Sequence, residues 1–509
     1  MDLTESIEIV KPPKRKEKLT RVLLLATVVA SFGSFQCGYT LWMVNNPAAI
    51  LLEFPNSTFE KRPVVVRFRE KLLGRTIIVF PIGGFLGALF IGFLVDRCGR
   101  KGALMTNNCL NIFAATFMGL SKVVHTSQFA LFARFVNGIS SGIFSCIVPL
   151  YIGEISPPNL RGSLYMVSMF GLTFGILVAQ LLSLREALGT SGGLALLMSL
   201  TGIMASFNII LLYYIPESPR FLFIQQHNVD AARQALIELR ENENVEEELE
   251  EMHQEDLFEK DRKNMNMITL LDSPEIRKSV LCTVVLMAGN QLTGVNGVYL
   301  YAERIYISLG LEGRHIRYML IVVNSVIHVV ILVMIAAIDS VGRRFLLLMG
   351  FMICSMVCIL LAVSLEVQVY GGIVVAYFST FFSITFIIGH MSGPGPIPYL
   401  MTGELFLQSA RGSAYVIGGF MNWFARFIVS VLYVFIEPKI GPYSLLIFWP
   451  VCIAIFIYVI KMVPETMGKT FLEIQKGMET HKRQRRKSDH KADHKADHKA
   501  DHKADHKAD

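Results

Sequence analysis

Charged residues are scarce in this chain of 509 residues. Asp, Glu, Lys and Arg make up 17% of it, whereas 52% of the residues are hydrophobic. Soluble globular domains carry about 25% charged residues. The shortage of charge argues against a soluble protein and predicts a membrane protein.

Features that define several other protein classes are missing. The eight cysteines lie in or beside apolar segments, which is typical of buried thiols and not of a disulfide framework. The polar parts contain no nucleotide-binding loop, metal cluster or nucleophile motif, so we expect no enzyme activity, no cofactor and no metal site. The first apolar run, from Val22, is too long for a signal peptide.

The chain carries a net charge of +7, and a basic protein can bind nucleic acid. The basic residues, however, cluster beside apolar segments, as at 11–21 and 481–487. Basic residues in such positions face lipid headgroups on the cytoplasmic side of a membrane. We therefore expect contact with the lipid bilayer and no nucleic-acid binding.

Long apolar segments are what the sequence has in abundance. A bilayer core requires roughly 20 apolar residues per helix. Twelve candidate segments begin near residues 22, 75, 103, 127, 163, 190, 279, 316, 345, 372, 412 and 443, and one long polar stretch at 217–276 separates six from six. This pattern predicts an all-α membrane protein with twelve transmembrane helices in two six-helix bundles.

The predicted organisation has five parts. They are a cytoplasmic N-terminus (1–20), an N-terminal bundle (21–215), a cytoplasmic linker with short helices (216–278), a C-terminal bundle (279–463) and a cytoplasmic tail (464–509). The tail ends in D-H-K-A repeats, whose histidines recur at i, i+4. We favour a disordered low-complexity segment over metal binding there.

Three motifs occur once in each half, in the same order. The copies are displaced by 243 to 250 residues, which indicates an internal duplication. The motifs are D-x-x-G-R-[RK] at Asp96–Lys101 and Asp339–Arg344, G-E-x6-R-G at Gly153–Gly162 and Gly403–Gly412, and P-E at Pro216–Glu217 and Pro464–Glu465.

The charged residues of these motifs predict ion pairs that lock the two halves together in one conformational state. Removing one member of a partly buried pair costs about 3–5 kcal/mol. We expect Glu154 to pair with Arg161, Glu404 to pair with Arg411, and Arg134, inside an apolar segment, to pair with Glu154. Simple topology anchoring is the alternative. The full predicted set is Asp96, Arg100, Arg134, Glu154, Arg161, Glu217, Asp339, Arg343, Arg344, Glu404, Arg411 and Glu465.

Two apolar segments contain residues that interrupt a helix. In "FIIGHMSGPGPIPYLMTGELF", three prolines remove backbone donors one turn after His390. A break at membrane depth is tolerated where it lines a cavity. His390 is therefore a candidate functional residue, and an interhelical hydrogen-bonded histidine is the alternative.

The other interrupted segment, "GNQLTGVNGVYLYAERIY", presents neutral amides and hydroxyls inside an apolar helix. Asn290, Thr293 and Asn296 recur at helical spacing. Asn422 and Trp423, in a later segment, add an amide and a flat ring. Such groups can bind the hydroxyls and the apolar face of a sugar without any charge.

From about Leu19 to Lys476, the chain resembles facilitative sugar transporters of the major facilitator superfamily. The three duplicated motifs, Q-L-T-G-V-N and G-P-G-P-I-P carry this resemblance, and "IIGH", "GILVAQ" and "GPYS" resemble the fructose-type subclass. The resemblance implies the major facilitator fold and alternating access to a central sugar. It implies sugar contacts by Gln291, Asn290, Asn296, His390, Asn422, Trp423, Met169, Gln180 and Tyr39, and a gate containing Tyr301, Pro394 and Pro396.

The chain also departs from the family pattern. Met169 stands where the family has a glutamine, Ile327 where it has an asparagine, and Leu300 where it has a gate tyrosine, while Asn290 stands where a second glutamine is usual. A hydroxyl left unpaired in a buried site costs about 1–3 kcal/mol. Altered solute affinity is expected.

Passive (uniport) transport of a hexose, fructose and/or glucose, is the function that we expect. A urate or other non-hexose uniporter, a proton-coupled sugar symporter and a non-transporting sugar sensor stay open. The first apolar segment has no acid of the kind that related proton symporters carry, although His390 could titrate. We expect a multi-pass plasma-membrane protein with both termini cytoplasmic, glycosylated at Asn56 of "NST". The sequence does not predict an oligomeric state.

Overall fold

The computed structural model describes residues 17–45, 63–124, 127–184, 186–188, 193–259, 267–273, 276–311 and 313–477. Asn56 and the D-H-K-A repeats lie outside the described residues, so the predictions for them stay predictions.

The N-terminal half is built from α1 (Arg21–Asn45), α3 (Pro63–Val123), α4 (Ser127–Ile155), α5 (Arg161–Leu182) and α6 (Leu194–Tyr213). The long α3 consists of two helices joined at Gly99, whose φ of 71° lies in the left-handed region that favours glycine. A side chain at this position would also meet Glu217, because a Cβ would lie 2.5 Å from the Glu217 carboxylate. The glycine of the first D-x-x-G-R motif therefore makes the turn between two membrane passes.

The C-terminal half contains the two predicted helix breaks. One separates α10 (Arg277–Leu292) from α11 (Val295–Ser308) at Gly294, whose φ is 86°. The other separates α13 (Arg343–Ser392) from α14 (Ile397–Glu404) at the glycine–proline run. The remaining helices are α12 (Gly313–Val341), α15 (Gln408–Phe435), α16 (Glu437–Ile440), the 3-10 helix η3 (Gly441–Ile447) and α17 (Trp449–Met462).

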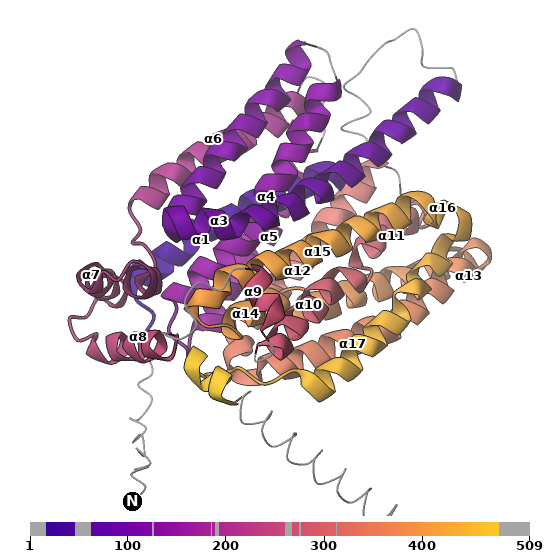
Figure 1. Ribbon diagram of the computed structural model, residues 1–509. Helices are drawn as coiled ribbons and strands as arrows, with labels where there is room; N and C mark the ends of the chain where they lie inside the picture. Colours follow the sequence, from indigo (N-terminus) through magenta and orange to yellow (C-terminus); the bar gives the residue numbers. More distant parts are fainter. Residues whose placement is uncertain are drawn as a thin grey trace, which may run out of the picture.

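Short helices connect the two halves. They are the π-helical turn η1 (Phe221–Gln225), α7 (Val229–Arg240), α8 (Glu246–Glu259) and α9 (Met267–Asp272). α7 and α8 lie side by side at one end of the molecule (Figure 1). Two of the repeated motifs lie at the same end, since Arg240 of α7 donates to the Ile155 carbonyl and Glu255 of α8 accepts from the Gln408 backbone N–H. We call it the motif end.

Within the described residues, nine helical segments are long and apolar enough to cross a membrane. One of them, Ile77–Ser121, spans 45 residues and contains the Gly99 turn, so it supplies two passes. The shorter apolar helix at Ser199–Tyr213 and the interrupted pair α10–α11 supply the others. The prediction of an all-α membrane protein with twelve passes is confirmed.

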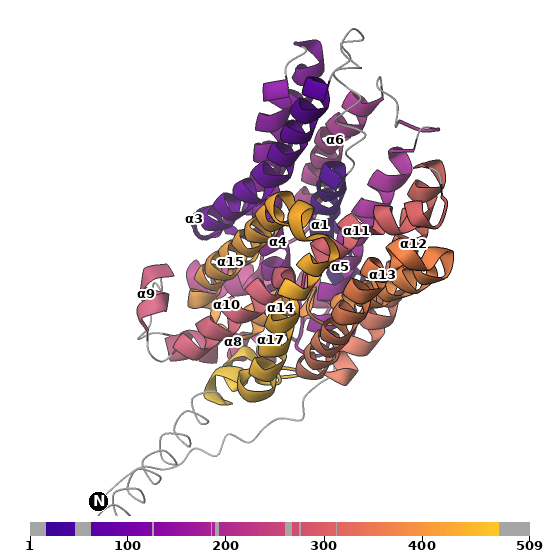
Figure 2. The ribbon, with the colours of Figure 1, turned by 90° about the vertical axis from the view of Figure 1, so that its right-hand side faces the viewer.

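The helices form two bundles, and each has its own apolar core. The N-terminal bundle is drawn in indigo and purple, and the C-terminal bundle in pink, orange and yellow (Figures 1 and 2). The bundles contact each other through α3 against α15 and through α5 against α12. Any site between the bundles is therefore bordered by these four helices.

Candidate solute site and cross-bundle latch

Glu154, at the end of α4, is a buried carboxylate surrounded by donors from its own half. Arg100 approaches it with Nε 2.9 Å from Oε2, and Ser218 donates its hydroxyl proton to the same oxygen. Glu217 accepts hydrogen bonds from the backbone N–H groups of Arg100 and Lys101, at 3.1 Å for each of the shorter contacts. The three motifs of the N-terminal half thus converge on one cluster.

The C-terminal half repeats this cluster. Glu404 binds Arg343 Nη2 at 3.2 Å and accepts from Thr466 Oγ1 at 2.6 Å. Glu465 accepts from the backbone N–H groups of Arg343 and Arg344, both at 3.0 Å. The internal repeat therefore encodes the same structure twice: an arginine on a buried glutamate, and a second glutamate capping the helix after the glycine.

Polar contacts also join the two bundles at the motif end. Gln408 Nε2 donates to Glu154 Oε1 at 3.0 Å, and Arg411 Nη1 lies 3.6 Å from the same oxygen. Asp339 accepts from the backbone N–H of Gly162 at 3.1 Å and of Ser163 at 2.7 Å. We call this set the cross-bundle latch: Glu154, Gln408, Arg411, Asp339 and the backbone of Gly162–Ser163. Its contacts join the two bundles at the motif end.

Two of the pairings predicted from sequence are wrong. Glu154 pairs with Arg100 and Arg411, not with Arg161, and Glu404 pairs with Arg343, not with Arg411. In each half, the glutamate of the G-E-x6-R-G motif is bound by the arginine of the D-x-x-G-R-[RK] motif. The guanidinium of Arg161 stacks instead on the Phe471 ring, with its central carbon 3.9 Å from the ring centre.

The predicted pair of Arg134 with Glu154 is also wrong. Both residues lie on α4, and their separation of 20 positions corresponds to about 30 Å of helix at 1.5 Å per residue. Arg134 donates to the backbone carbonyl of Thr40 at 3.2 Å and lies over the Phe80 ring, 4.9 Å from its centre. This arginine is therefore held within the N-terminal bundle, far from the latch.

The linker helix α8 reinforces the motif end. Glu255 accepts from the backbone N–H of Gln408 at 3.1 Å, and Glu259 accepts from Ser409 N at 3.1 Å and from Ser409 Oγ at 2.9 Å. Burial and the neighbouring Glu255 raise the pKa of Glu259 to about 7, against the effect of its hydrogen bonds to Ser409. The start of α15 is thus capped by two carboxylates from α8.

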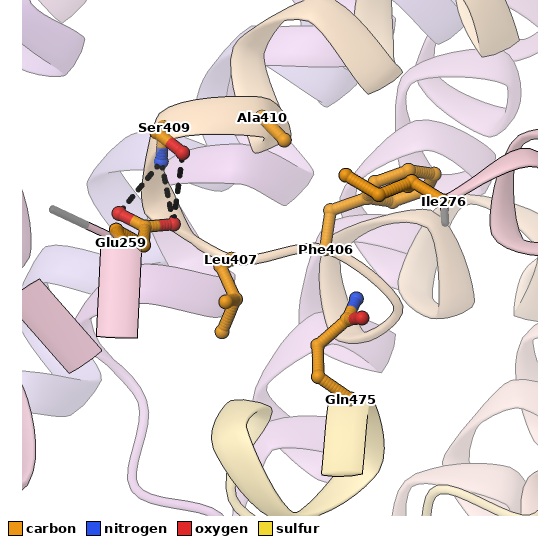
Figure 3. A pocket seen from close by; sticks show the side chains of 7 residues that line it. All are labelled: Glu259, Ile276, Phe406, Leu407, Ser409, Ala410 and Gln475. Atoms are coloured by element: carbon orange, nitrogen blue, oxygen red, sulfur yellow. Dashed lines mark hydrogen bonds between the residues drawn. The ribbon is translucent and has the colours of Figure 1, made fainter. Parts of the chain in front are cut away.

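A small pocket lies beside these contacts (Figure 3). It is lined by Glu259, Ile276, Phe406, Leu407, Ser409, Ala410 and Gln475. They belong to α8, the residue before α10, the α14–α15 turn, the first turn of α15 and the segment after α17. The pocket therefore lies at the motif end and outside the region between the bundles where a solute would cross.

Four amide side chains in the C-terminal bundle form one hydrogen-bonded network. Gln291 Nε2 donates to Asn290 Oδ1 at 3.0 Å and to Asn422 Oδ1 at 3.4 Å, while Asn296 Nδ2 donates to Gln291 Oε1 at 3.0 Å. Asn290 Nδ2 in turn donates to the backbone carbonyl of Gly395 at 2.7 Å. The network therefore connects the break in α10–α11 to the break in α13–α14.

His390 lies beside this network. Its Nδ1 is 3.2 Å from Thr293 Oγ1, and the residue is 3% exposed. Pro394 packs closely against Gly350 of α13, where even a Cβ atom would lie only 2.2 Å from the Pro394 Cδ. Pro396 directly precedes α14. The structure thus brings together the sequence-predicted Asn290, Gln291, Asn296, His390 and Asn422.

The opposite bundle contributes Gln180 of α5, which accepts from Asn324 Nδ2 of α12 at 3.3 Å. Sequence reasoning missed Asn324, although it is a polar residue in an apolar segment. It lies one turn before Ile327, which is buried in the C-terminal core. An asparagine amide is therefore present on α12, one turn from where the family pattern places it.

Three predicted residues make other contacts. Tyr39 donates to the backbone carbonyl of Leu197 at 2.6 Å, inside the N-terminal bundle. Tyr301 donates to the Gly441 carbonyl at 2.7 Å, inside the C-terminal bundle. Trp423 donates from Nε1 to Ser145 Oγ at 3.0 Å and so bridges the two bundles.

Met169 and Asp96 complete the account of the predicted residues. The Met169 sulfur accepts a weak hydrogen bond from Tyr165 at 3.6 Å. Asp96 is exposed, unlike its repeat counterpart Asp339. Within the described ranges, no group of three or more His, Cys, Asp or Glu residues is placed to hold a metal ion.

The sequence of this chain is similar to a family model and to transporters from mammals. Residues 26–477 match the family model described as "Sugar (and other) transporter". Solute carrier family 2, facilitated glucose transporter member 5 of Rattus norvegicus is 43% identical over 461 residues, 90% of this chain and 92% of that protein. Member 7 of Homo sapiens is 39% identical over 477 residues, 91% of each chain.

Solved structures give the same fold. The proton:xylose symporter XylE bound to 6-bromo-6-deoxy-D-glucose superposes with a TM-score of 0.78 at 20% identity, over 90% of this chain and 99% of that one. The inward-open conformation of XylE from E. coli gives a TM-score of 0.65 at 21% identity, over 88% of this chain and 98% of that one. At these identities, the match concerns the fold.

Proposed function

We propose that this chain, which belongs to the sugar transporter family, is a facilitative uniporter of a hexose, glucose and/or fructose, and works by alternating access. The observation that supports this most is the amide network of Gln291, Asn290, Asn296 and Asn422, which lies where the two broken helices meet. We assign no catalytic role to any residue.

The network is suited to exchange its hydrogen bonds with a sugar. The Gln291–Asn422 contact is long, at 3.4 Å, so a hydroxyl can replace it at little cost. Amides present both donors and acceptors, which is what a hydroxyl needs. We propose that Gln291, His390 and Gln180 contact the solute, and we leave Tyr39 and Tyr301 out because their hydroxyls are used inside single bundles.

The latch supports the alternating part of the proposal. Opening the motif end breaks the contacts of Glu154 with Gln408 and Arg411, and those of Asp339 with α5. Glu154 then keeps Arg100, and Glu404 keeps Arg343, because these pairs lie within one bundle. A buried charge that keeps a partner in both states avoids the several kcal/mol that a stranded charge would cost.

The units that move are proposed to be residues 21–215 and 279–463, joined by the linker 216–278. We further propose that the motif end faces the cytoplasm, that the chain resides in the plasma membrane and that Asn56 is glycosylated. The basic residues around the motifs support this orientation through the positive-inside rule.

A proton-coupled symporter is the second candidate, because XylE is a proton:xylose symporter. α1 contains no Asp or Glu between Arg21 and Asn45, and this supports uniport over symport. A pH gradient distinguishes the two mechanisms. Purified protein in liposomes should equilibrate labelled glucose or fructose, and accumulation above equilibrium under an inward proton gradient would contradict uniport.

The same assay separates the remaining alternatives. Gln291→Ala should raise the half-saturation concentration about tenfold, since one buried hydrogen bond is worth about 1.4 kcal/mol. Uptake of urate without uptake of either hexose would favour the non-hexose alternative. A protein that binds hexose and transports no solute would favour the sensor.

A further inference from the structure

One charged side chain in the membrane region has no place in the sugar site described above. Arg426 lies on α15, one turn after Asn422, within an otherwise apolar segment. Its guanidinium lies 5.5 Å from the centre of the Trp423 ring. An ionisable residue inside a membrane segment is costly and calls for a functional explanation.

Arg426 points away from lipid. At 100° per residue, the exposed side chains of Phe424, Ile428 and Phe435 define the lipid-facing side of α15, and Arg426 lies almost opposite to them. Asn422 and Tyr433, on the same side as Arg426, are buried, whereas Arg426 itself is only half-buried. Arg426 therefore faces the other helices and still keeps part of its surface exposed.

The surroundings of Arg426 come from both bundles and are neutral. Its electrostatic neighbours are Cys37 of α1, Tyr299 of α11 and Tyr399 of α14. Thiol and phenol groups carry no charge near pH 7. Among the described residues, no carboxylate lies within 4.0 Å of its guanidinium, so Arg426 forms no ion pair with any of them.

We propose that Arg426 is an anion-binding residue of the solute site and that this transporter accepts hexose-sized organic monoanions, of the sugar-acid type. The guanidinium would bind the carboxylate in a two-pronged geometry, while Asn422 and Gln291, about one turn away, would bind the ring hydroxyls. This inference rests on the proposed function, because it places the solute between the bundles.

A matched pair of solutes isolates the charge. Glucuronate and glucuronamide share ring and hydroxyls and differ in a carboxylate against a neutral amide. Full-length protein in liposomes takes up labelled glucose, and each compound is tested as a competitor at constant salt. We expect glucuronate to inhibit at a concentration at least tenfold below glucuronamide, and Arg426→Asn to bring the two within about twofold.

Two further variants complete the design. Arg426→Lys keeps a cation and should retain a preference for glucuronate, and Arg97→Asn, which removes an exposed arginine at the motif end, should leave the ratio unchanged. Because each result is a ratio within one variant, a lower yield of folded protein does not affect it. Glucose uptake with equal inhibition by both compounds in the wild type would overturn the inference, as would an unchanged ratio in Arg426→Asn.

Binding is measured in parallel by the thermal stabilisation that each compound gives to the purified protein. If neither glucose nor fructose is taken up, the proposed function fails. The stabilisation ratio of glucuronate to glucuronamide then decides the inference alone: a preference that is lost in Arg426→Asn supports it, and no preference overturns it.

Discussion

Glu154 has polar contacts with both bundles at the motif end, and Glu154→Gln should shift the conformational equilibrium toward the state open at that end. The substitution keeps the size of the side chain and removes its charge. A hydrogen bond to a charged group is worth about 1.5–3 kcal/mol, against about 0.5–1.5 for a neutral one. The Gln408 contact therefore weakens by about 1–1.5 kcal/mol.

The attraction of Arg411 at 3.6 Å is lost as well, although Arg411 keeps Glu255 at 3.7 Å. Adding about 1 kcal/mol for this partly compensated contact gives a total of about 2–2.5 kcal/mol. At 1.36 kcal/mol per factor of ten, the fraction of molecules open at the motif end rises about 30- to 70-fold while it remains small. The pair with Arg100 lies within one bundle and does not contribute to this shift.

Cys146 provides the assay. Its sulfur is fully buried between α4 and α15, 3.6 Å from the Tyr415 carbonyl of the opposite bundle. Opening the motif end separates these helices and exposes the thiol. The rate of Cys146 labelling by a membrane-permeant maleimide, in a background without the exposed Cys98 and Cys109, should rise by the same factor as the open fraction.

Glu465→Gln is the matched control. It makes the same chemical change at a glutamate that caps Arg343 and Arg344 within one bundle, so labelling should stay near the wild-type rate. Equal labelling of Glu154→Gln and wild type would refute the assignment of Glu154 to the latch. Equal acceleration in both variants would show that the effect is loss of stability and not opening.

Three other predictions follow from the same contacts. Asp339→Asn removes the charge to which three donors of α5 bind, so the rate of Cys146 labelling should rise about tenfold or more. Labelling at the wild-type rate would show that α5 and α12 do not separate at this end. Because the pKa of Glu259 is raised from 4.5 to about 7, docking of α8 on α15 is strongest at low pH and weakens as pH rises through 7. Amide hydrogen exchange in α8, corrected for its intrinsic pH dependence, should therefore be faster at pH 8 than at pH 6. Glu259→Gln should abolish that difference. His390→Ala should raise the half-saturation concentration for hexose about tenfold if the imidazole binds solute, whereas an unchanged value with less folded protein would make His390 a strut on Thr293.

The fold could be read from the sequence because membrane burial imposes length and composition on each segment. The breaks at Gly294 and Gly393–Pro396 were also predictable, since proline and glycine act locally on the backbone. The turn at Gly99 follows from the repeated motif. These signals depend on neighbouring residues alone, so one sequence contains them.

The pairing of charges could not be read in the same way. Which arginine meets Glu154 depends on how loops distant in sequence are brought together, and the nearest candidate, Arg161, stacks on Phe471 instead. Only the pair of Arg134 with Glu154 could have been rejected beforehand, from the helix length between them. Arg426 and Asn324 were overlooked because a polar residue in an apolar segment shows its importance only when its face of the helix is known.

The ring of Phe471 bears on the order in which this chain matures during synthesis. It lies 3.9 Å from the guanidinium carbons of both Arg161 and Arg411 and 4.7 Å from that of Arg220, which places residues of both bundles and the linker around one side chain. A chain emerging from the ribosome can complete the cluster of Arg100, Glu154 and Ser218 once the first half is made. The three guanidinium groups around the ring must wait for a residue near the end of the last described segment. Until Phe471 has been made, the two halves can meet through the cross-bundle latch, but the stack that joins Arg220 of the linker to an arginine of each bundle cannot form, so this stack is a late addition to contacts already in place.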